Sequence, residues 1–381
     1  MSTRSSTSEA DERFERRALA QAERGLALAH PNPTVGAVIV KNDQVIGEGF
    51  HEYDKRDHAE IVALKQAGKK ANGATLYVTL EPCCTIGRTG PCTEAIIQAG
   101  IRRVVVSIAD PNPAVSGKGI AQLRCANIRV DVGRCADEAR QRNEDFAKWI
   151  TTGLPFITLK SALTLDGKIA LRPGHSTSIS GEASRAYVQR LRHEADALLT
   201  GIGTVLVDDP LLTDRTGEPR RRPLLRIVLD SQLRLPLKSR IVKSARHDVT
   251  VFTTRYAYSP KARALARAGV AVVRVRANAG RVDLGEVMRK LGRRQILNVL
   301  LEAGAELNGS ALEAGIVDKM ILFYARSILG NGGVPMARLS SRAFAKVPSL
   351  QHVTVRACDS DLVVQGYFHD VYRNNRSRRK N

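Results

Sequence analysis

Apolar positions in the first 150 residues alternate between helical and strand-like spacing. Residues 11–29 carry apolar side chains at the intervals of an amphipathic helix. Residues 35–40 and 45–50 are short apolar runs separated by a polar turn, a pattern that predicts a hairpin. Helices are also expected from near His58 and from Pro91, and buried strands over 75–80 and 101–108. This alternation predicts an α/β domain whose sheet is covered by helices.

The segment Thr-Thr-Gly-Leu-Pro at 151–155 interrupts this pattern and is the expected domain boundary. A second α/β pattern follows it. Its predicted strands cover 157–163, 197–200, 225–229, 249–253, 270–275, 296–301 and 319–324, and its predicted helices cover 187–194 and 305–314. We therefore expect one domain over 1–150, a second over 151–370 and a basic, disordered tail over 371–381.

The chain has 381 residues, which is too long for one ordinary core and agrees with two domains. No apolar run approaches the length of a membrane span, and the polar N-terminus lacks the apolar stretch of a secretory signal. These features predict a soluble, cytoplasmic protein with no membrane partner. The sequence leaves the oligomeric state open, a homo-oligomer included.

The net charge of +21 favours anionic partners, either nucleic acid or phosphorylated small molecules. Only 4% of residues are aromatic, which is few for a surface that stacks on bases. We therefore expect a phosphorylated metabolite and no nucleic acid. Part of the charge lies in Arg220-Arg221-Arg222, which is flanked by prolines and is expected to form an exposed loop.

Three of the six cysteines fall within ten residues, which favours metal binding or catalysis over disulfides in a chain without a secretion signal. His58, Cys83 and Cys92 can give Zn²⁺ three ligands and leave the fourth position for water, as in catalytic sites. Zinc lowers the pKa of such a water. Glu60 lies two residues from His58 and can move protons between that water and a leaving amine.

Two other interpretations of these residues are a closed structural zinc site and simply buried cysteines. A closed site would need Cys84 as its fourth ligand, but adjacent Cys83 and Cys84 are hard to place on one tetrahedron. H-x-E with P-C is the signature of zinc deaminases. That signature usually closes with C-x-x-C, whereas eight residues separate Cys83 from Cys92 here.

Several motifs resemble the bifunctional deaminase/reductase family of riboflavin biosynthesis. They are Leu80-Glu81-Pro82-Cys83, Gly87-Arg88-Thr89-Gly90-Pro91-Cys92, His30-Pro31-Asn32-Pro33-Thr34-Val35-Gly36, Gly49-Phe50-His51 and Asp110-Pro111-Asn112-Pro113. The resemblance implies a cytidine-deaminase-like, three-layer α/β/α domain. It implies zinc ligands at His58, Cys83 and Cys92, a proton shuttle at Glu60, and substrate contacts from Asn32 and His51.

The chain departs from this family directly after the first zinc cysteine. The family usually has Ser-His-His there, and this chain has Cys84-Thr85-Ile86. Two polar groups that face the substrate are therefore replaced, while the zinc ligands are retained.

The second half carries weaker signals of its own. It has no G-x-G-x-x-G, so a Rossmann fold is unsupported. A helix expected just after Gly304 offers backbone amides that can hold a phosphate. These residues by themselves predict an α/β domain that binds an anionic ligand.

The family resemblance continues through this half, in Leu159-Lys160-Ser161, Asp208-Asp209-Pro210-Leu211-Leu212-Thr213 and Glu302-Ala303-Gly304. It implies a dihydrofolate-reductase-like domain that uses NADPH to reduce the ribose of the deaminated product to a ribityl chain. The implied substrate contacts are Lys160, Ser176, Arg192, Leu212, Arg215 and Glu302, with both arginines suited to the phosphate. The implied NADPH contacts are Ala162, Ser178, Thr204, Asp208, Ser231 and Gly304. Lys160 and Asp208 are also candidates for assisting proton transfer, and Ser178 replaces the usual tryptophan.

The leading hypothesis is therefore an enzyme that deaminates a diaminopyrimidine ribosyl phosphate and then reduces its sugar. One alternative is a zinc deaminase that acts on nucleic acid or a free nucleoside. Another is a relative with an impaired deaminase that retains only the reductase or a binding role.

Overall fold

The computed structural model describes residues 9–175, 177–254, 259–340 and 349–372. The described chain divides into two compact units. Residues 9–152 and Pro219–Arg221 form the first unit, and Gly153–Glu218 and residues 222–372 form the second. Across the described ranges, no helix combines the length and the apolar character needed to cross a bilayer.

The first unit is built on a five-stranded sheet of order β2-β1-β3-β4-β5. Its strands are β1 (Gly36–Lys41), β2 (Gln44–Phe50), β3 (Thr75–Val78), β4 (Arg103–Val106) and β5 (Arg129–Val132). β1 runs antiparallel to both of its neighbours, and β3, β4 and β5 are parallel. The predicted hairpin is confirmed, with Gly36 opposite Phe50.

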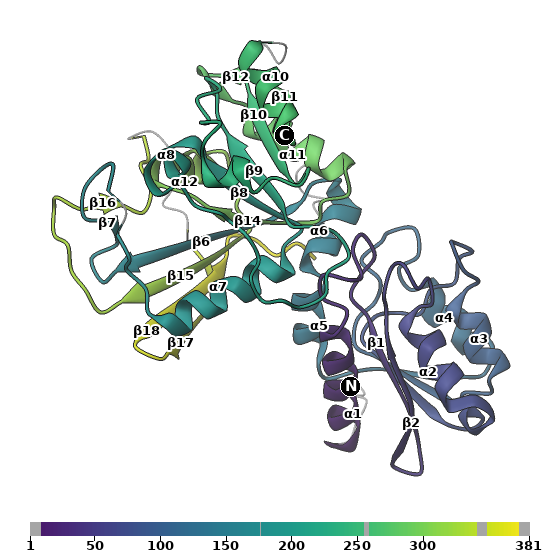
Figure 1. Cartoon of the computed structure of the whole chain (residues 1–381). Helices are drawn as coiled ribbons and strands as arrows, with labels where there is room; N and C mark the ends of the chain where they lie inside the picture. The colour runs from purple at the N-terminus through teal and green to yellow at the C-terminus, as the bar shows by residue number, and fades with distance from the viewer. Residues whose placement is uncertain (1–8, 176, 255–258, 341–348, 373–381) are drawn as a thin grey trace, which may run out of the picture. The chain divides into compact units, whose positions relative to one another are not determined.

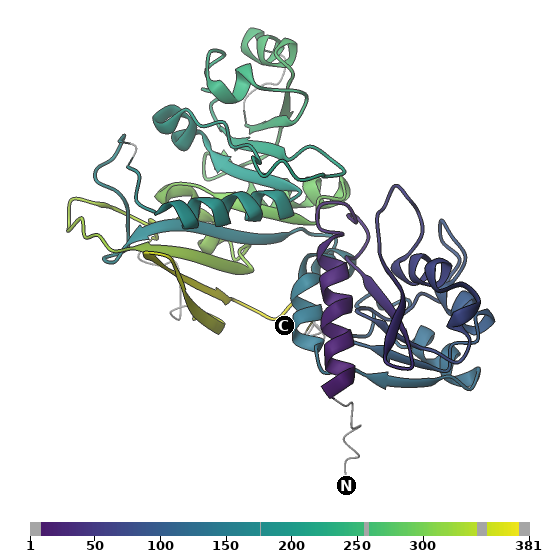
Figure 2. The ribbon, with the colours of Figure 1, turned by 60° about the horizontal axis from the view of Figure 1, so that its bottom comes forward.

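Helices cover both faces of this sheet (Figures 1 and 2). Phe14 and Ala18 of one helix pack against Val38 on one face, and on the other face a Cβ at Gly47 would lie 2.3 Å from the Ala63 carbonyl oxygen. The helices are α1 (Glu9–Glu23), α2 (Ala59–Ala67), the 3-10 turn η1 (Gly68–Ala71), α3 (Cys92–Gln98), α4 (Lys118–Cys125), α5 (Ala136–Arg142) and α6 (Glu144–Thr152). The predicted three-layer α/β/α arrangement is confirmed.

The first helix is shorter than its apolar pattern predicted. α1 ends at Glu23, and the chain then turns, with the Gly25 N–H donating to the Ala22 carbonyl. Ala27 has a φ of 60°, which no helical residue adopts. The Leu28 carbonyl accepts from the Tyr53 N–H instead of continuing a helix. Tertiary pairing thus overrides the local periodicity over 24–29.

The second unit is built on a nine-stranded sheet of order β11-β10-β9-β8-β14-β6-β15-β18-β17. Its strands are β6 (Phe156–Thr164), β8 (Ala197–Gly201), β9 (Leu225–Leu229), β10 (Val249–Thr253), β11 (Val270–Arg274), β14 (Asn298–Glu302), β15 (Lys319–Ala325), β17 (Gln351–Cys358) and β18 (Asp361–Tyr367). The pairs from β11 to β15 are parallel and the last two are antiparallel. Two small pairs accompany the sheet, β7 (Lys168–Ala170) with β16 (Val334–Pro335) and β12 (Ala277–Asn278) with β13 (Arg281–Val282).

Both faces of the parallel part are buried, which explains why its strands are continuous apolar runs. Leu198 and Val228 point into one apolar cluster, and Leu199 and Ile227 point into the other. The helices of this unit are α7 (Glu182–Glu194), α8 (Ile202–Asp208), α9 (Arg240–Lys243), α10 (Pro260–Arg267), α11 (Leu284–Arg293) and α12 (Ala305–Glu313). The predicted α/β class of the second domain is confirmed.

Candidate active sites

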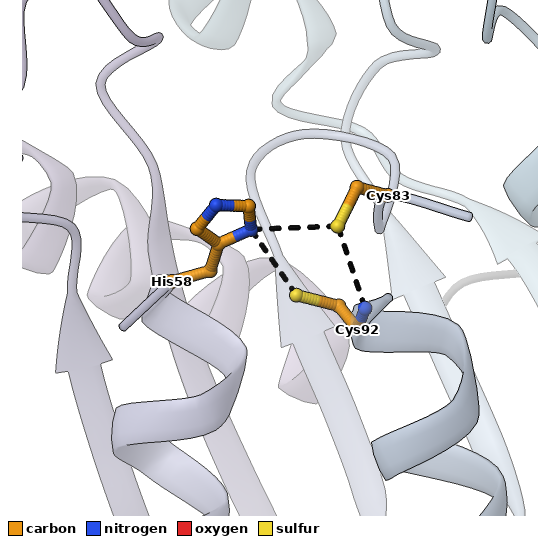
Figure 3. A group of neighbouring side chains, drawn as sticks. All are labelled: His58, Cys83 and Cys92. Carbon is orange, nitrogen blue, oxygen red and sulfur yellow. Dashed lines mark hydrogen bonds between the residues drawn. The ribbon is translucent and has the colours of Figure 1, made fainter. Parts of the chain in front are cut away.

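Three side chains predicted to bind zinc lie together in the first unit (Figure 3). His58 caps the start of α2, Cys83 follows β3, and Cys92 is the first residue of α3. The Nδ1 atom of His58 lies 3.4 Å from the Sγ atom of Cys83 and 3.3 Å from that of Cys92. The turn after a parallel strand and the starts of two helices therefore converge on one point.

The geometry of this group fits a zinc ion. Zn–S and Zn–N bonds of about 2.3 and 2.1 Å at tetrahedral angles imply an S···N separation of roughly 3.6 Å, and the two separations in the structure, 3.4 and 3.3 Å, are close to it. Within the described part of the chain, the ligand atoms that gather here come from His58, Cys83 and Cys92. The adjacent Cys84 is not among them, so the three protein ligands leave room for a water or substrate atom.

Hydrogen bonds, one of them from the start of α3, favour the thiolate form of Cys83. The backbone N–H of Cys92, at the start of α3, donates to the Cys83 sulfur over 3.4 Å. The pKa of Cys83 is lowered, first by the hydrogen bond from the Cys92 side chain and then by His58, although burial opposes this. The pKa of Cys92 is raised by the same bond and by burial. Cys92 therefore holds a proton that metal binding would displace.

Glu60 is in the first turn of α2 and only 3% of it is exposed. Burial raises the pKa of its carboxyl group above the ordinary value. A carboxyl group whose pKa is moved towards neutrality can both accept and release a proton during a reaction. The Glu60 carboxyl group interacts electrostatically with His58 and Cys83, two of the predicted zinc ligands.

Asn32 and His51, the predicted substrate contacts, are hydrogen-bonded to each other. Asn32 Nδ2 lies 3.0 Å from His51 Nε2, and His51 Nδ1 lies 2.9 Å from the Asp57 carbonyl oxygen. A carbonyl only accepts, so His51 Nδ1 carries the proton and Nε2 accepts from the Asn32 amide. Burial lowers the pKa of His51, which favours this neutral form.

The segment between the two zinc cysteines extends into solvent at the position where the family motif changes. Ile86 is 87% exposed, an unusual environment for an isoleucine. Arg88 lies over the Tyr53 ring, with its guanidinium carbon 4.2 Å from the ring centroid, and donates to the Tyr53 carbonyl. An apolar side chain and a cation thus stand next to each other on this loop.

Sequence reasoning gave no role to Glu81, although it lies in a quoted motif. It is buried directly before Pro82 and Cys83, and its carboxylate accepts three backbone N–H groups. The sequence does place this carboxylate directly after an apolar strand. An unpaired charge would be costly there, so a buried carboxylate with hydrogen-bond partners could have been expected.

In the second unit, three of the predicted substrate contacts form an ion-pair cluster. Lys160 on β6 stands opposite Glu302 on β14. Arg192 of α7 binds both carboxylate oxygens of Glu302, at 2.7 and 3.0 Å, and Lys160 Nζ lies 3.9 Å from Glu302. Burial lowers the pKa of Lys160. Burial alone would raise the pKa of Glu302, but the positive charges of Lys160 and Arg192 outweigh it, so the pKa of Glu302 is lowered.

Two other predicted substrate contacts, Leu212 and Arg215, differ in exposure. Leu212 is buried, and the carbonyl of the following Thr213 accepts from Arg192. Arg215 is exposed and is anchored through its backbone N–H, which donates to the Gln189 side chain. Ser176 lies outside the described residues.

The predicted NADPH contacts are spread over several loops. Gly304 caps the start of α12, and a Cβ there would meet nothing within 4 Å, so space remains beside the helix amides. Thr204 and Asp208 belong to α8, and the chain turns after it at Asp209, which has a left-handed backbone conformation. Ser231 follows β9 and its hydroxyl accepts from the Val282 N–H. The other two are Ala162, half-buried on β6, and Ser178, which is exposed.

Three buried polar atoms near these positions lack a hydrogen-bond partner among the described residues. They are Thr200 Oγ1, near the end of β8, Asp230 Oδ1, directly before Ser231, and Asn308 Oδ1, on α12. Unpaired buried polar atoms are rare unless a ligand or water satisfies them. Together with the open start of α12, they fit a polar, phosphate-bearing cofactor such as NADPH.

Comparison with known proteins matches both halves of the chain to family profiles. Residues 8–108 match the cytidine and deoxycytidylate deaminase zinc-binding region, and residues 155–364 match the RibD C-terminal domain. The second match covers more than half of the chain. The two profiles correspond to the zinc group and to the Lys160 cluster, respectively.

Relatives match nearly the full length. The riboflavin biosynthesis protein RibD of Aquifex aeolicus is 42% identical over 93% of this chain and 98% of its own length. The structure of Acinetobacter baumannii RibD, 38% identical, superposes with a TM-score of 0.83 over 94% of this chain and 99% of that one. A Thermotoga maritima structure described as a diaminohydroxyphosphoribosylaminopyrimidine deaminase/5-amino-6-(5-phosphoribosylamino)uracil reductase gives 0.80 at 37% identity, over 94% and 98%.

These matches favour the metabolic hypothesis over a deaminase of nucleic acid. A zinc-binding deaminase region and a reductase domain stand in one chain, in the same order and over the same length as in those relatives. Zn²⁺ and NADPH are the cofactors of the two halves. The chain belongs to the RibD family and is a bifunctional deaminase and reductase of riboflavin biosynthesis.

Proposed function

We propose that residues 1–150 deaminate a diaminopyrimidine ribosyl phosphate and that residues 151–370 reduce the ribosyl group of its product. His58, Cys83 and Cys92 hold Zn²⁺, which supplies Lewis-acid activation of a water molecule. The convergence of their three ligand atoms within 4.8 Å is the observation that supports this assignment most strongly.

Glu60 moves the protons of the deamination. Its carboxylate takes up a proton as water attacks the pyrimidine carbon, and it returns that proton to the departing amine. The buried position of Glu60 on α2 supports this role, because burial favours the protonated carboxyl that must form.

Asn32 and His51 orient the pyrimidine. Asn32 Nδ2 is engaged with His51, so we assign its Oδ1 acceptor to the substrate. The hydrogen bond from His51 to the Asp57 carbonyl fixes the imidazole ring, which holds the Asn32 amide in one orientation. Pre-organised contacts of this kind lower the entropic cost of binding.

The proposed reductase site contains the ion-pair cluster of Lys160, Arg192 and Glu302. Glu302 holds Arg192 in place through two hydrogen bonds, and Lys160 is available to bind sugar oxygen atoms and assist proton transfer, together with Asp208. Arg215 binds the substrate phosphate, and Leu212 and Ser176 complete the substrate contacts. Ala162, Ser178, Thr204, Asp208, Ser231 and Gly304 line the site of NADPH, which supplies the hydride.

The partners that we propose are small phosphorylated pyrimidines and not nucleic acid, because aromatic residues are too scarce for a base-stacking surface. We also propose a cytoplasmic location, where NADPH is supplied, and a homo-oligomer as the state to test by light scattering.

Product analysis by mass spectrometry tests this function. The diamino substrate without NADPH should give ammonia and the deaminated ribosyl product, and addition of NADPH should convert that product to the ribityl compound. Recovery of unchanged diamino substrate in both reactions would show that the first unit does not deaminate it. Accumulation of the deaminated ribosyl product in the presence of NADPH would show that the reductase is inactive.

A further inference from the structure

Glu81 is a buried carboxylate that acts on the segment of the chain carrying a zinc ligand. It lies between β3 and Cys83 and is 4% exposed. Its Oε2 atom accepts the backbone N–H groups of Asp110 and Gly117, at 3.0 and 2.8 Å, and its Oε1 atom accepts that of Ile120 at 3.1 Å. Three N–H donors around one carboxylate compensate for its burial.

Two of these donors belong to the start of α4. The residue that caps this helix is Gly117, with a φ of 79° and no side chain to accept the first N–H groups. Helix starts leave such groups without partners, and a side-chain oxygen usually satisfies them. Here Glu81, 36 residues earlier in the chain, takes that place.

The start of α4 also lies directly against the zinc segment. A Cβ at Gly119 would lie 2.1 Å from the Pro82 carbonyl oxygen, so only glycine permits this approach. On the other side, the Thr93 N–H donates to the Cys83 carbonyl over 3.2 Å, and the Thr93 hydroxyl donates to Gln122 of α4 over 2.8 Å. The backbone at Cys83 is thereby held between α3 and α4.

We propose that Glu81 is a positioning residue of the deaminase site, which fixes the Cys83 ligand by fastening its segment to α4 and to the loop that begins at Asp110. The carboxylate oxygens of Glu81 are occupied by three backbone N–H groups, so its contribution is to hold the backbone. Outer contacts that orient metal ligands commonly change metal affinity by about 10- to 100-fold when they are removed. The proposal rests on the zinc centre proposed above and concerns how firmly that centre is held.

The test compares full-length Glu81→Ala and Glu81→Gln with wild type. The measurements are the rate of zinc transfer to a chromogenic chelator, the visible absorption spectrum of the Co²⁺-substituted protein, and the kinetics of both reactions. Glu81→Ala should release zinc roughly 10- to 100-fold faster. It should shift the Co²⁺ bands and lower the kcat of deamination more than it raises KM, while reduction is unchanged. Glu81→Gln, which keeps one acceptor oxygen, should give intermediate values.

Arg103→Ala is the matched control, because it destabilises the same unit at the opposite end of the sheet. Arg103 begins β4, pairs with Asp11 and Asp131, and stands opposite Thr75 at the start of β3. This variant should lose stability but keep wild-type zinc release and Co²⁺ bands.

The proposal is overturned if Glu81→Ala behaves as Arg103→Ala does, with lower stability and unchanged zinc release. If Glu81→Ala does not fold, Glu81→Gln decides the matter, since zinc release at the wild-type rate would equally overturn it. Failure of the zinc centre itself would be recognised separately, because wild-type protein would then contain no zinc to release.

Discussion

The imidazole rings of His51 and His58 meet edge to face, with centroids 5.2 Å apart. One ring belongs to a proposed substrate contact and the other to a zinc ligand. His51 is fixed in turn by Asn32 and by the Asp57 carbonyl, and His58 by its place at the start of α2. A substrate held by Asn32 and His51 would therefore lie beside the metal, which is the placement that deamination requires.

The zinc assignment predicts that wild-type protein contains about one Zn²⁺ per chain. His58→Ala or Cys92→Ser should remove it, because two remaining ligands hold zinc weakly. Cys84→Ser is the matched control and should keep zinc, since Cys84 lies outside the ligand group. Elemental analysis after gel filtration measures the stoichiometry, and full zinc content in His58→Ala would refute the assignment.

The altered loop predicts a working deaminase with weakened substrate binding. Thr85 reaches less far than histidine, and the exposed Ile86 offers no hydrogen bond to a polar substrate. Restoring Ser-His-His with Cys84→Ser, Thr85→His and Ile86→His should lower the KM of deamination more than it raises kcat, as expected for uniform binding.

If instead Arg88 already compensates from its position on Tyr53, the restored loop will leave KM unchanged. A native protein that releases no ammonia, and gains that activity with the restored loop, would show that this deaminase is impaired.

Asp110 gives the first unit a pH-dependent stability. Burial, followed by the nearby Glu81 and Cys83, raises its pKa to about 6, although the Asn112 N–H opposes this. Because the folded state holds this proton more tightly than the unfolded state, the contribution of Asp110 to stability falls as the pH rises from about 4 to 7. Asp110→Asn should therefore be more stable than wild type by roughly 3 kcal/mol at neutral pH and nearly equal to it near pH 4.

Fluorescence of Trp149 measures this difference during chemical unfolding, because it is the only tryptophan and lies in α6 of the first unit. Asp137→Asn, which changes an exposed carboxylate of the same unit, is the matched control. If the difference in unfolding free energy between Asp110→Asn and wild type stays constant between pH 4 and 7, the raised pKa of Asp110 is contradicted.

The reductase site predicts separate effects on substrate and cofactor. Arg215→Ala should raise the KM for the sugar phosphate by roughly 10-fold or more, because a charge-assisted hydrogen bond contributes about 1.5–3 kcal/mol. The KM for NADPH and the thermal stability should change little, since the Arg215 side chain is exposed. Arg222→Ala, which removes a neighbouring arginine that donates to the Gln295 carbonyl, is the control. If Arg215→Ala loses only its affinity for NADPH, the assignment of Arg215 to the substrate and not to the cofactor is wrong.

The parts of this protein that the sequence predicted are those encoded by local patterns. The hairpin over 35–50 follows from two short apolar runs on either side of a polar turn, and the parallel strands of the second sheet follow from continuous apolar runs. The group of His58, Cys83 and Cys92 could be predicted because the spacing of these residue types is typical of zinc sites, and the structure brings their ligand atoms together. Strand β17 was missed because it is exposed along most of its length and carries no burial pattern.

Relationships between distant residues could not be predicted in the same way. The pairing of Lys160 with Glu302 depends on the register of two parallel strands, which apolar runs alone do not encode. The role of Glu81 depends on a helix start 36 residues later. Arg220, Arg221 and Arg222 were expected to be exposed, but each is half-buried. For Arg221 the reason is that it pairs with Asp54 and stacks on Tyr53 within the first unit.

The central claim, that this zinc group with Glu60 performs the deamination, is tested most directly by ammonia release from zinc-loaded Glu60→Gln. The variant keeps the three ligands, so it should bind zinc as wild type does. Loss of the proton shuttle should slow ammonia release by about 10²-fold or more. Reduction of separately supplied deaminated substrate, measured in the same sample, should be unchanged. Ammonia release at the wild-type rate would contradict the account.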